Sequence, residues 1–256
     1  MIPYFAYHSL PLGPVDIQVW GLFVSAGLAA ALLVARHELH RSRLPLGTLY
    51  DLAAYLLLPA IVMSRVLYIL LYDFAAAADP WSWLELWRGG MSSFGGYVGA
   101  ALGLWAFRRR HRVDLGPYVE ALAYAFPLGY GIGRLGCFFI HDHPGIMSAS
   151  WLAVAYPGGP RLDLGLLLSV FGFALFGAFA VLKRRGVGLS VRRIFLPLLL
   201  VSYGAARFGL DFLRAWDGPV VDQRFLLLTP AQYGAAVLVV IGLWLFRRRP
   251  VPVRPD

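Results

Sequence analysis

Apolar segments of membrane-spanning length recur along this chain and restrict its fold more than any other feature. A helix needs about 20 predominantly apolar residues to cross the hydrocarbon core of a bilayer. Hydrophobic residues make up 59% of the sequence and charged residues only 14%, which disfavours a soluble domain, where about 25% are charged. The segments of suitable length are residues 17–35, 52–72, 91–107, 117–140, 164–182, a sixth that starts at 194, and 225–246.

Clusters of Arg and Lys alternate with these segments and set the expected orientation. Cytoplasmic loops retain basic residues, so the formal net charge of +9 indicates membrane topology rather than nucleic-acid binding. Every cluster falls on the cytoplasmic side if the chain crosses seven times with its N-terminus outside. The clusters occupy residues 36–43, 108–112, 183–193 and 247–254.

The predicted fold is therefore an all-α integral membrane protein with seven transmembrane helices and a cytoplasmic C-terminus. The sequence shows no separate soluble region, so residues 1–256 are expected to form a single membrane domain. Residues 247–256 are expected to be a disordered basic tail. The lack of Lys and Arg in residues 1–18 argues against a cleaved signal peptide, which begins with a basic region.

The segment from Asp79 to Trp87 predicts a short interfacial helix between the second and third spans. Asp79 is a helix-capping residue, Pro80 suits a first helical turn, and Trp83 and Trp87 are four residues apart on one helical face. Tryptophan prefers the headgroup level of a membrane. The segment therefore fits either a plain aromatic belt or a surface that guides a substrate.

Four arginines lie within or beside apolar segments, where they are costly. An Arg at the bilayer centre costs roughly 2.5 to 3.5 kcal/mol on insertion scales, so such residues usually face an interior cavity and have a partner. The predicted topology places Arg65, Arg134, Arg207 and Arg214 in the outer half of the membrane. Because guanidinium groups bind phosphate through paired hydrogen bonds, the expected ligand is an anionic lipid headgroup.

The sixth span carries the densest polar pattern. Tyr203, Arg207, Asp211 and Arg214 are spaced i, i+4, i+8 and i+11, which places them on one face of a continuous helix. Asp211 is then able to pair with both arginines and fix their orientation for a ligand. The same spacing also fits an ion-pair network that only holds helices together.

Glycines accompany the arginines in the third and fourth spans. Gly133 precedes Arg134 in a run of glycines from Gly129 to Gly136, and Gly95 and Gly96 stand at the start of the third span. Glycine permits close approach of another backbone or a ligand. Tight helix packing explains the glycines but not the arginine among them.

Titratable side chains follow the fourth span. His141, Asp142 and His143 are suited to proton transfer, with the carboxylate orienting an imidazole, and a solvated polar loop is the alternative. Two histidines in this spacing are a weak metal signal without a third ligand, so no metal is expected. Cys137, the only cysteine, fits buried packing or, beside Arg134, a reactive thiolate.

These motifs together resemble those of the prolipoprotein diacylglyceryl transferases, bacterial integral membrane enzymes. Gly133-Arg134-Leu135-Gly136 with Phe138 and Gly145 resembles the family signature. Tyr203-Gly204 followed by Arg207-Phe208 and Asp211 is similar to the sixth-span motif. The resemblance also covers Trp20-Gly21-Leu22, Ser64-Arg65-Val66-Leu67-Tyr68, Gly89-Gly90-Met91-Ser92 with Gly95-Gly96, and Gln232.

The resemblance implies transfer of the diacylglyceryl group of phosphatidylglycerol to the lipobox cysteine of a prolipoprotein, forming a thioether and releasing glycerol phosphate. It implies a multi-pass protein of the bacterial inner membrane that needs no cofactor and binds the prolipoprotein signal peptide. Arg134 and Arg207 match essential arginines and Tyr203 an important tyrosine. The expected catalytic residues are Arg134, Arg207, His141, Asp142 and His143. The expected substrate contacts are Arg134, Tyr203, Arg207, Asp211, Arg214, Arg65, Gly133, Gly95 and Gly96.

The sequence departs from the family pattern around the expected base. Phe94 stands where the family has a histidine, Cys137 and Ile140 stand where it has asparagines, and Asp142 stands at a glutamate position. Residues 159–163 replace a polar segment of the family. We therefore expect His141 or His143 to take over proton transfer. Two other functions stay open: a divergent phospholipid-binding relative with another acceptor, and a non-catalytic lipid-binding membrane protein.

Overall fold

The computed structural model describes residues 1–12, 15–85, 90–186, 193–217 and 226–248. They form two compact units, one of residues 1–38 with 116–256 and the other of residues 39–115, and each unit is described by itself. The predicted disordered tail begins at Arg247, the last residue of a helix, and residues 249–256 lie outside the described residues.

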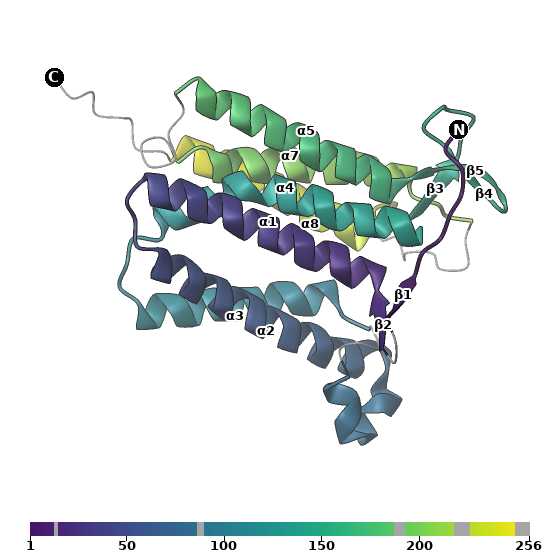
Figure 1. Cartoon of the computed structure of the whole chain (residues 1–256), viewed down its shortest axis with the longest axis horizontal. Helices are drawn as coiled ribbons and strands as arrows, with labels where there is room; N and C mark the ends of the chain where they lie inside the picture. The colour runs from purple at the N-terminus through teal and green to yellow at the C-terminus, as the bar shows by residue number, and fades with distance from the viewer. Residues whose placement is uncertain (13–14, 86–89, 187–192, 218–225, 249–256) are drawn as a thin grey trace. The chain divides into compact units, whose positions relative to one another are not determined.

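Each predicted span contains a helix in the structure, and the protein is mostly helical (Figure 1). Five helices are long and apolar enough to cross a membrane by length and composition: those that begin at Val19, Leu46, Leu164, Phe195 and Pro230. The third and fourth predicted spans are helical but are not among these five. The helices are α1 (Val19–Arg41), α2 (Leu46–Tyr72), α3 (Ser93–Arg110), α4 (Gly116–Ile140), α5 (Leu164–Arg184), α7 (Phe195–Leu210) and α8 (Pro230–Arg247).

Two small antiparallel sheets were not predicted. Strands β1 (Ser9–Leu12) and β2 (Val15–Gln18) form a hairpin directly before α1, so the first helix begins two residues later than predicted. Between α4 and α5, strands β3 (Pro144–Met147), β4 (Val154–Tyr156) and β5 (Gly159–Asp163) form a sheet in the order β3-β5-β4. Strands this short show no clear alternation of polar and apolar residues, so they were not predictable from hydrophobic periodicity.

The interfacial helix predicted for Asp79 to Trp87 is corrected by the structure. Two short 3-10 helices, η1 (Phe74–Ala78) and η2 (Pro80–Trp83), occupy this region, and Trp87 lies outside the described residues. Asp79 caps η2 as predicted, because its carboxylate accepts a hydrogen bond from the backbone N–H of Trp81 at 3.0 Å. The Ser82 hydroxyl donates to backbone carbonyls of the preceding turns, which favours the tight 3-10 conformation over an α-helix.

Glycines of α3 let its backbone touch that of α2. A methyl group at Gly99 would lie 2.1 Å from the carbonyl oxygen of Pro59, and one at Gly103 would lie 1.7 Å from that of Tyr55. Gly95 is equally close to Met63, with 2.3 Å between its methyl position and the carbonyl oxygen. Spacing of four residues places these glycines on one helical face, so they serve the packing of α2 against α3.

We expect Gly103→Ala to destabilise the α2–α3 pair by more than 1 kcal/mol, because a new methyl group in a packed contact typically costs about 1 to 3 kcal/mol. Gly47→Ala is the matched control, since nothing lies within 4 Å of its methyl position. Thermal unfolding of the detergent-solubilised variants measures both effects. Equal melting temperatures for the two variants would contradict this account of the contact.

The larger unit places α1, α4, α5, α7 and α8 side by side, with their axes roughly aligned (Figure 1). Glycines mediate close contacts here too: Gly27 of α1 faces Gly129 of α4, and Gly172 of α5 faces Gly131 of α4. The Ser169 hydroxyl reinforces the second contact by donating to the Gly131 carbonyl at 2.8 Å. Helix packing thus accounts for most of the glycine run in the fourth predicted span.

Two buried glutamates, Glu120 and Glu38, make contacts at the helix ends remote from the three-stranded sheet. Both carboxylate oxygens of Glu120 on α4 accept hydrogen bonds from the first backbone N–H groups of α7, at 2.7 Å from Phe195 and 3.1 Å from Leu196. Glu120 therefore acts as the N-terminal cap that α7 lacks in its own sequence. Near the C-terminal ends of α1 and α5, Glu38 pairs with Lys183.

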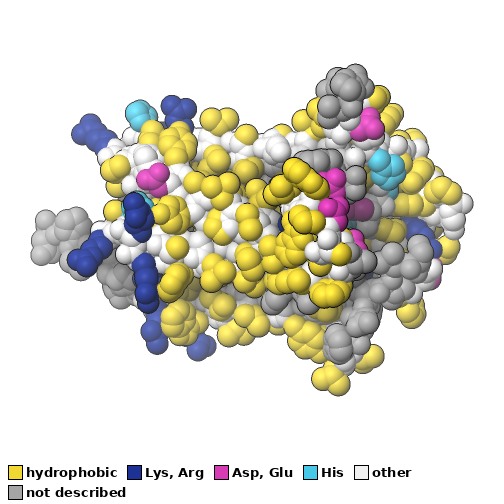
Figure 2. All heavy atoms as spheres, turned by 90° about the horizontal axis from the view of Figure 1, so that it is seen from below, with side chains coloured by type: hydrophobic (Ala, Val, Ile, Leu, Met, Phe, Trp, Pro, Cys, Tyr) yellow, Lys and Arg dark blue, Asp and Glu magenta, His cyan; other side chains and the backbone are white. Residues whose placement is uncertain are grey.

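Hydrophobic side chains cover the helix walls in the view of Figure 2, whereas Lys and Arg side chains gather at helix ends. Large exposed apolar residues include Leu33 of α1, Leu58 of α2, Val170 of α5 and Val240 of α8. Such broad apolar walls are typical of helices that contact lipid.

Candidate functional site

Two tyrosines from neighbouring helices connect the arginines of α4 and α7. The guanidinium carbon of Arg134 lies 5.2 Å from the centre of the Tyr130 ring, and Tyr130 meets Tyr203 of α7 edge to face at 5.2 Å. Tyr203 and Arg207 are four residues apart and therefore lie on one face of α7. The structure thus brings three of the predicted residues, Arg134, Tyr203 and Arg207, around one aromatic pair.

A chain of polar contacts holds Arg207. Its Nη2 lies 3.0 Å from Oδ1 of Asp211, which is completely buried. The Thr229 hydroxyl donates to the other oxygen of Asp211 and accepts a hydrogen bond from the backbone N–H of Gln232. The Gln232 side chain in turn donates to the Phe208 carbonyl at the end of α7. The capped N-terminus of α8 therefore orients the carboxylate that orients Arg207.

Two buried donors at this site have no hydrogen-bond partner among the described residues: Nη1 of Arg207 and the hydroxyl of Tyr130. Leaving a buried polar group unpaired costs about 1 to 3 kcal/mol, and more for a charged group. Because Nη2 of Arg207 is already fixed by Asp211, the guanidinium group presents one free N–H edge. Such an edge is suited to an anionic acceptor.

The predicted helical face that carries both Asp211 and Arg214 is corrected. Helix α7 ends at Leu210, residues 211–213 form a 3-10 turn, and Arg214 has extended backbone. Arg214 therefore leaves the helical face that its i+11 spacing predicted. Its backbone instead forms an antiparallel bridge with Gly145, which attaches the exit of α7 to the three-stranded sheet.

Arg65, Gly95 and Gly96 belong to the smaller unit. The guanidinium group of Arg65 is buried and donates to the carbonyl oxygens of Ser82 and Gly90, so it connects η2 and the segment before α3 to α2. Gly95 faces the backbone of α2, whereas nothing lies within 4 Å of the methyl position of Gly96. In the larger unit, Gly133 has only side-chain and backbone atoms of Val24 at the edge of that range.

Two residues that were not predicted from the sequence, Asp163 and Tyr156, hold His141 in place. Its Nδ1 lies 2.7 Å from the Asp163 carboxylate, and Tyr156 donates to the same carboxylate oxygen at 2.6 Å. Asp163 also caps α5, because its other oxygen accepts from the Leu166 N–H. His141 has a left-handed backbone with φ 52° and stacks on Tyr4 at 4.8 Å. Strand pairing brings Asp163 to His141, which sequence spacing does not reveal.

Burial and the adjacent Asp163 carboxylate raise the pKa of Tyr156. A raised folded-state pKa stabilises the fold fully below the unfolded value of about 10, and this contribution is lost as the pH rises above it. We expect Tyr156→Phe to lose about 1 to 3 kcal/mol at pH 8, where the Tyr156 hydrogen bond is intact. Melting temperatures from pH 8 to 11 should fall more steeply in the wild type than in Tyr156→Phe, and parallel curves would contradict this role.

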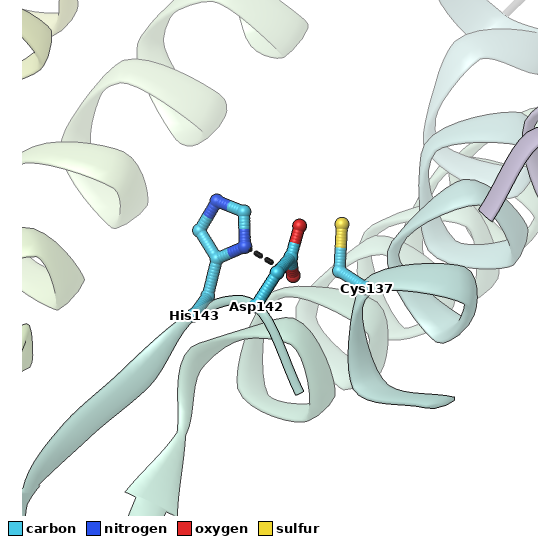
Figure 3. A group of neighbouring side chains, drawn as sticks. All are labelled: Cys137, Asp142 and His143. Carbon is cyan, nitrogen blue, oxygen red and sulfur yellow. Dashed lines mark hydrogen bonds and ion pairs between the residues drawn. The ribbon is translucent and has the colours of Figure 1, made fainter. Parts of the chain in front are cut away.

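The loop after α4 folds back, so that Asp142 and His143 lie close to Cys137 in the last turn of that helix. Figure 3 shows Asp142 between Cys137 and His143, with a hydrogen bond between Asp142 Oδ1 and His143 Nδ1. One ligand atom from each of the three side chains lies within 4.8 Å of the others. Arg134 also contacts this group, because its Nη1 lies 3.7 Å from the Cys137 sulfur. Asp142, His143 and Arg134 thus all surround the buried thiol.

An exposed ion pair joins β5 to the segment after α7. Both guanidinium nitrogens of Arg161 bind the Asp217 carboxylate, at 2.8 and 2.6 Å. The hydrogen bond from Arg161 lowers the pKa of Asp217. Because its carboxylate is half exposed, this pair contrasts with the buried pair of Arg207 and Asp211.

Apolar helix walls define the class: a multi-pass helical membrane protein, here with a buried arginine–tyrosine cluster in its larger unit. The model of one family, described as prolipoprotein diacylglyceryl transferase, matches residues 8–248. The chain belongs to the prolipoprotein diacylglyceryl transferase family.

Three relatives illustrate the similarity, and each is named phosphatidylglycerol–prolipoprotein diacylglyceryl transferase. The relative from Chromohalobacter salexigens is 32% identical over 95% of this chain and 93% of its own length. That from Xanthomonas oryzae pv. oryzae is 31% identical over 96% and 94%. That from Solidesulfovibrio magneticus is 30% identical over 96% of each chain.

Proposed function

We propose that this chain transfers the diacylglyceryl group of phosphatidylglycerol to a cysteine thiol of prolipoproteins. The names of its relatives state phosphatidylglycerol, prolipoprotein and diacylglyceryl transfer for them. The observation that carries the proposal is the cluster in which Tyr130 and Tyr203 lie between Arg134 and Arg207, with Nη1 of Arg207 and the Tyr130 hydroxyl unpaired among the described residues. These buried donors suit the phosphate of an anionic lipid.

The arginines have a direct role in this reaction. When the acceptor sulfur displaces the lipid phosphate from the glyceryl carbon, negative charge grows on the departing oxygen. Oriented donors in a water-poor site stabilise such charge, and one donor is typically worth a factor of about 100 to 1,000 in rate. Arg207 supplies a free N–H edge, Arg134 supplies a second cation, and Tyr203 lies near both. Asp211 acts by orienting Arg207.

The acceptor thiol must also lose its proton. We assign this activation to residues His141, Asp142 and His143. His143 and Asp142 are the nearer to the arginines, because both adjoin Cys137 and Cys137 contacts Arg134. His141 is enclosed by aromatic rings and held by Asp163, so it anchors the segment from within.

Seven spans in one membrane domain, with the N-terminus outside, remain our proposal for the topology, and the bacterial inner membrane for the location. The alternation of basic clusters supports it. In the larger unit, α4 ends, α5 begins and α7 ends at the three-stranded sheet, because Leu164 donates to the His143 carbonyl and Arg214 bridges Gly145. These helices therefore alternate in direction, and the arginine cluster lies toward the end that the topology places outside.

The remaining predicted contacts are proposed with narrower roles. Gly133 leaves room beside Arg134, and Gly96 leaves an open position at the start of α3. Arg65 and Gly95 contribute by shaping the smaller unit. Arg214 contributes through its cationic side chain near the exit of α7.

Incubation of the purified full-length protein with labelled phosphatidylglycerol and a lipobox peptide tests the function. Thioether-linked diacylglyceryl peptide together with released glycerol phosphate is the expected result. Lipid turnover without a thioether would instead support a relative with another acceptor. Neither product, in a protein that retains lipid binding, would support a non-catalytic lipid-binding protein.

A further inference from the structure

We infer that Phe126 and Tyr130 of α4 line the path of one acyl chain of the bound phospholipid, and that Phe126 selects straight chains over bent ones. This inference deepens the proposed function and rests on it, because it needs a lipid whose phosphate lies at Arg134 and Arg207. Three aromatic rings carry it. Phe126 stacks on Tyr130 with ring centres 5.7 Å apart and planes at 19°, and both rings meet Tyr203 of α7 edge to face.

The aromatic residues continue the arginine site along α4. Phe126, Tyr130 and Arg134 follow one another at intervals of four residues, so they lie on one face of the helix. At a rise of about 1.5 Å per residue, Phe126 lies about 12 Å from Arg134 along the helix axis, on the side away from the three-stranded sheet. A lipid held by its phosphate at Arg134 therefore meets Tyr130 first and Phe126 second.

The polarity of this aromatic surface changes along its length. Phe126 is 42% exposed although its ring packs against Tyr203, so its remaining surface is accessible to an apolar ligand. The Tyr130 hydroxyl is buried and has no hydrogen-bond partner among the described residues. The surface is thus apolar at Phe126 and polar beside Arg134. A phospholipid has the same order of chemistry, since its apolar chains extend away from a charged phosphate.

Two other faces of α4 are occupied by helix packing. A methyl group at Gly129 would lie 2.6 Å from a carbonyl oxygen of α1, and one at Gly131 would lie 3.2 Å from a carbonyl oxygen of α5. Backbone therefore fills the space beside both glycines. The face of Phe126 and Tyr130 instead carries aromatic rings and reaches α7 through Tyr203. An acyl chain that runs along α4 fits this face rather than the two glycine faces.

The distance between Phe126 and Arg134 determines which part of the chain meets the Phe126 ring. Carbon–carbon bonds of about 1.5 Å advance a straight chain by roughly 1.3 Å per bond, so about 12 Å corresponds to roughly nine bonds. This length reaches the middle of a common acyl chain, where a cis double bond bends an oleoyl chain. Two nearly parallel rings present a flat surface, against which a straight chain makes more dispersion contacts than a bent one. Phe126 therefore favours saturated chains.

Competition between two lipids tests this inference on the purified full-length protein. Equal amounts of dipalmitoyl- and dioleoyl-phosphatidylglycerol are offered in detergent micelles with a lipobox peptide, and the ratio of the two thioether products is measured. We expect the wild type to favour the dipalmitoyl product and Phe126→Ala to lower this ratio at least about threefold. Phe126→Leu, which keeps apolar bulk without a flat ring, should lower it as well, whereas Phe126→Trp should preserve it. Phe173→Ala is the matched control, since Phe173 of α5 is similarly exposed, at 38%.

The ratio of the two lipids that stay bound after detergent washing is a second measurement, which does not require transfer. It should fall in Phe126→Ala and stay unchanged in Phe173→Ala. A product ratio that is the same in the wild type, Phe126→Ala and Phe126→Leu overturns the inference, because the ring then only faces bulk lipid. An equal fall in Phe173→Ala overturns it too, since the effect is then not local to α4. A wild type that forms no thioether refutes the proposed function instead, and a fall in the bound ratio leaves the acyl-chain contact standing.

Discussion

Replacing Arg207 with Lys is expected to lower the rate of diacylglyceryl transfer roughly 100- to 1,000-fold while the protein stays folded. Lysine keeps the positive charge that pairs with Asp211. It lacks the second N–H edge, which in Arg207 is buried and without a partner among the described residues. A point charge does not replace a planar guanidinium group that binds two acceptors at once. Thioether formation under saturating phosphatidylglycerol measures the loss.

Arg161→Lys is the matched control for this prediction, because Arg161 also pairs with a carboxylate through both guanidinium nitrogens but at an exposed position. Its transfer rate should stay within about twofold of the wild type. Arg134→Lys should resemble Arg207→Lys. Full transfer activity in Arg207→Lys would mean that the arginine only holds helices together.

Asp211→Asn is expected to destabilise the protein by about 3 to 5 kcal/mol, the usual cost of removing one partner of a buried ion pair. Asp211 is completely buried and its side chain contacts both Arg207 and Thr229. Asparagine preserves the size of the side chain but leaves the Arg207 charge without its counter-ion. Unfolding of the detergent-solubilised variant, followed by far-ultraviolet circular dichroism, measures the change.

Asp217→Asn provides the comparison, since it removes one partner of the exposed pair with Arg161. Exposed ion pairs contribute little to stability because water screens them, so this variant should melt close to the wild type. If both substitutions cost the same, the buried network from Arg207 to Gln232 is not a stabilising unit.

Much of the helical architecture was predictable because lipid imposes a simple length rule. Apolar runs such as residues 164–182 predicted α5 almost residue for residue, since a spanning helix must satisfy its own backbone hydrogen bonds. Predictions failed where the chain leaves the helices. The 3-10 turns near Asp79 and the extended backbone at Arg214 depend on hydrogen bonds to distant or folded-back segments.

Of the candidate site, Arg134, Tyr203 and Arg207 were identifiable because charged residues in apolar segments are costly and therefore conspicuous. Thr229 and Asp163 were not, because their partners lie 18 and 22 residues away in sequence, at Asp211 and His141. The fold also brought Cys137 to Asp142 and His143, which the spacing of the two histidines did not predict.

The sequence alone determined that this protein is helical and built for a bilayer, and which of its residues are too polar for lipid. Hydropathy and charge are properties of single residues and their near neighbours, so they can be determined from the sequence without knowledge of the fold. The tertiary structure alone decided which polar groups meet: Arg207 with Asp211 and Thr229, and Cys137 with Asp142 and His143. Such contacts are set by how helix ends and short strands pack, and that packing depends on the whole chain at once.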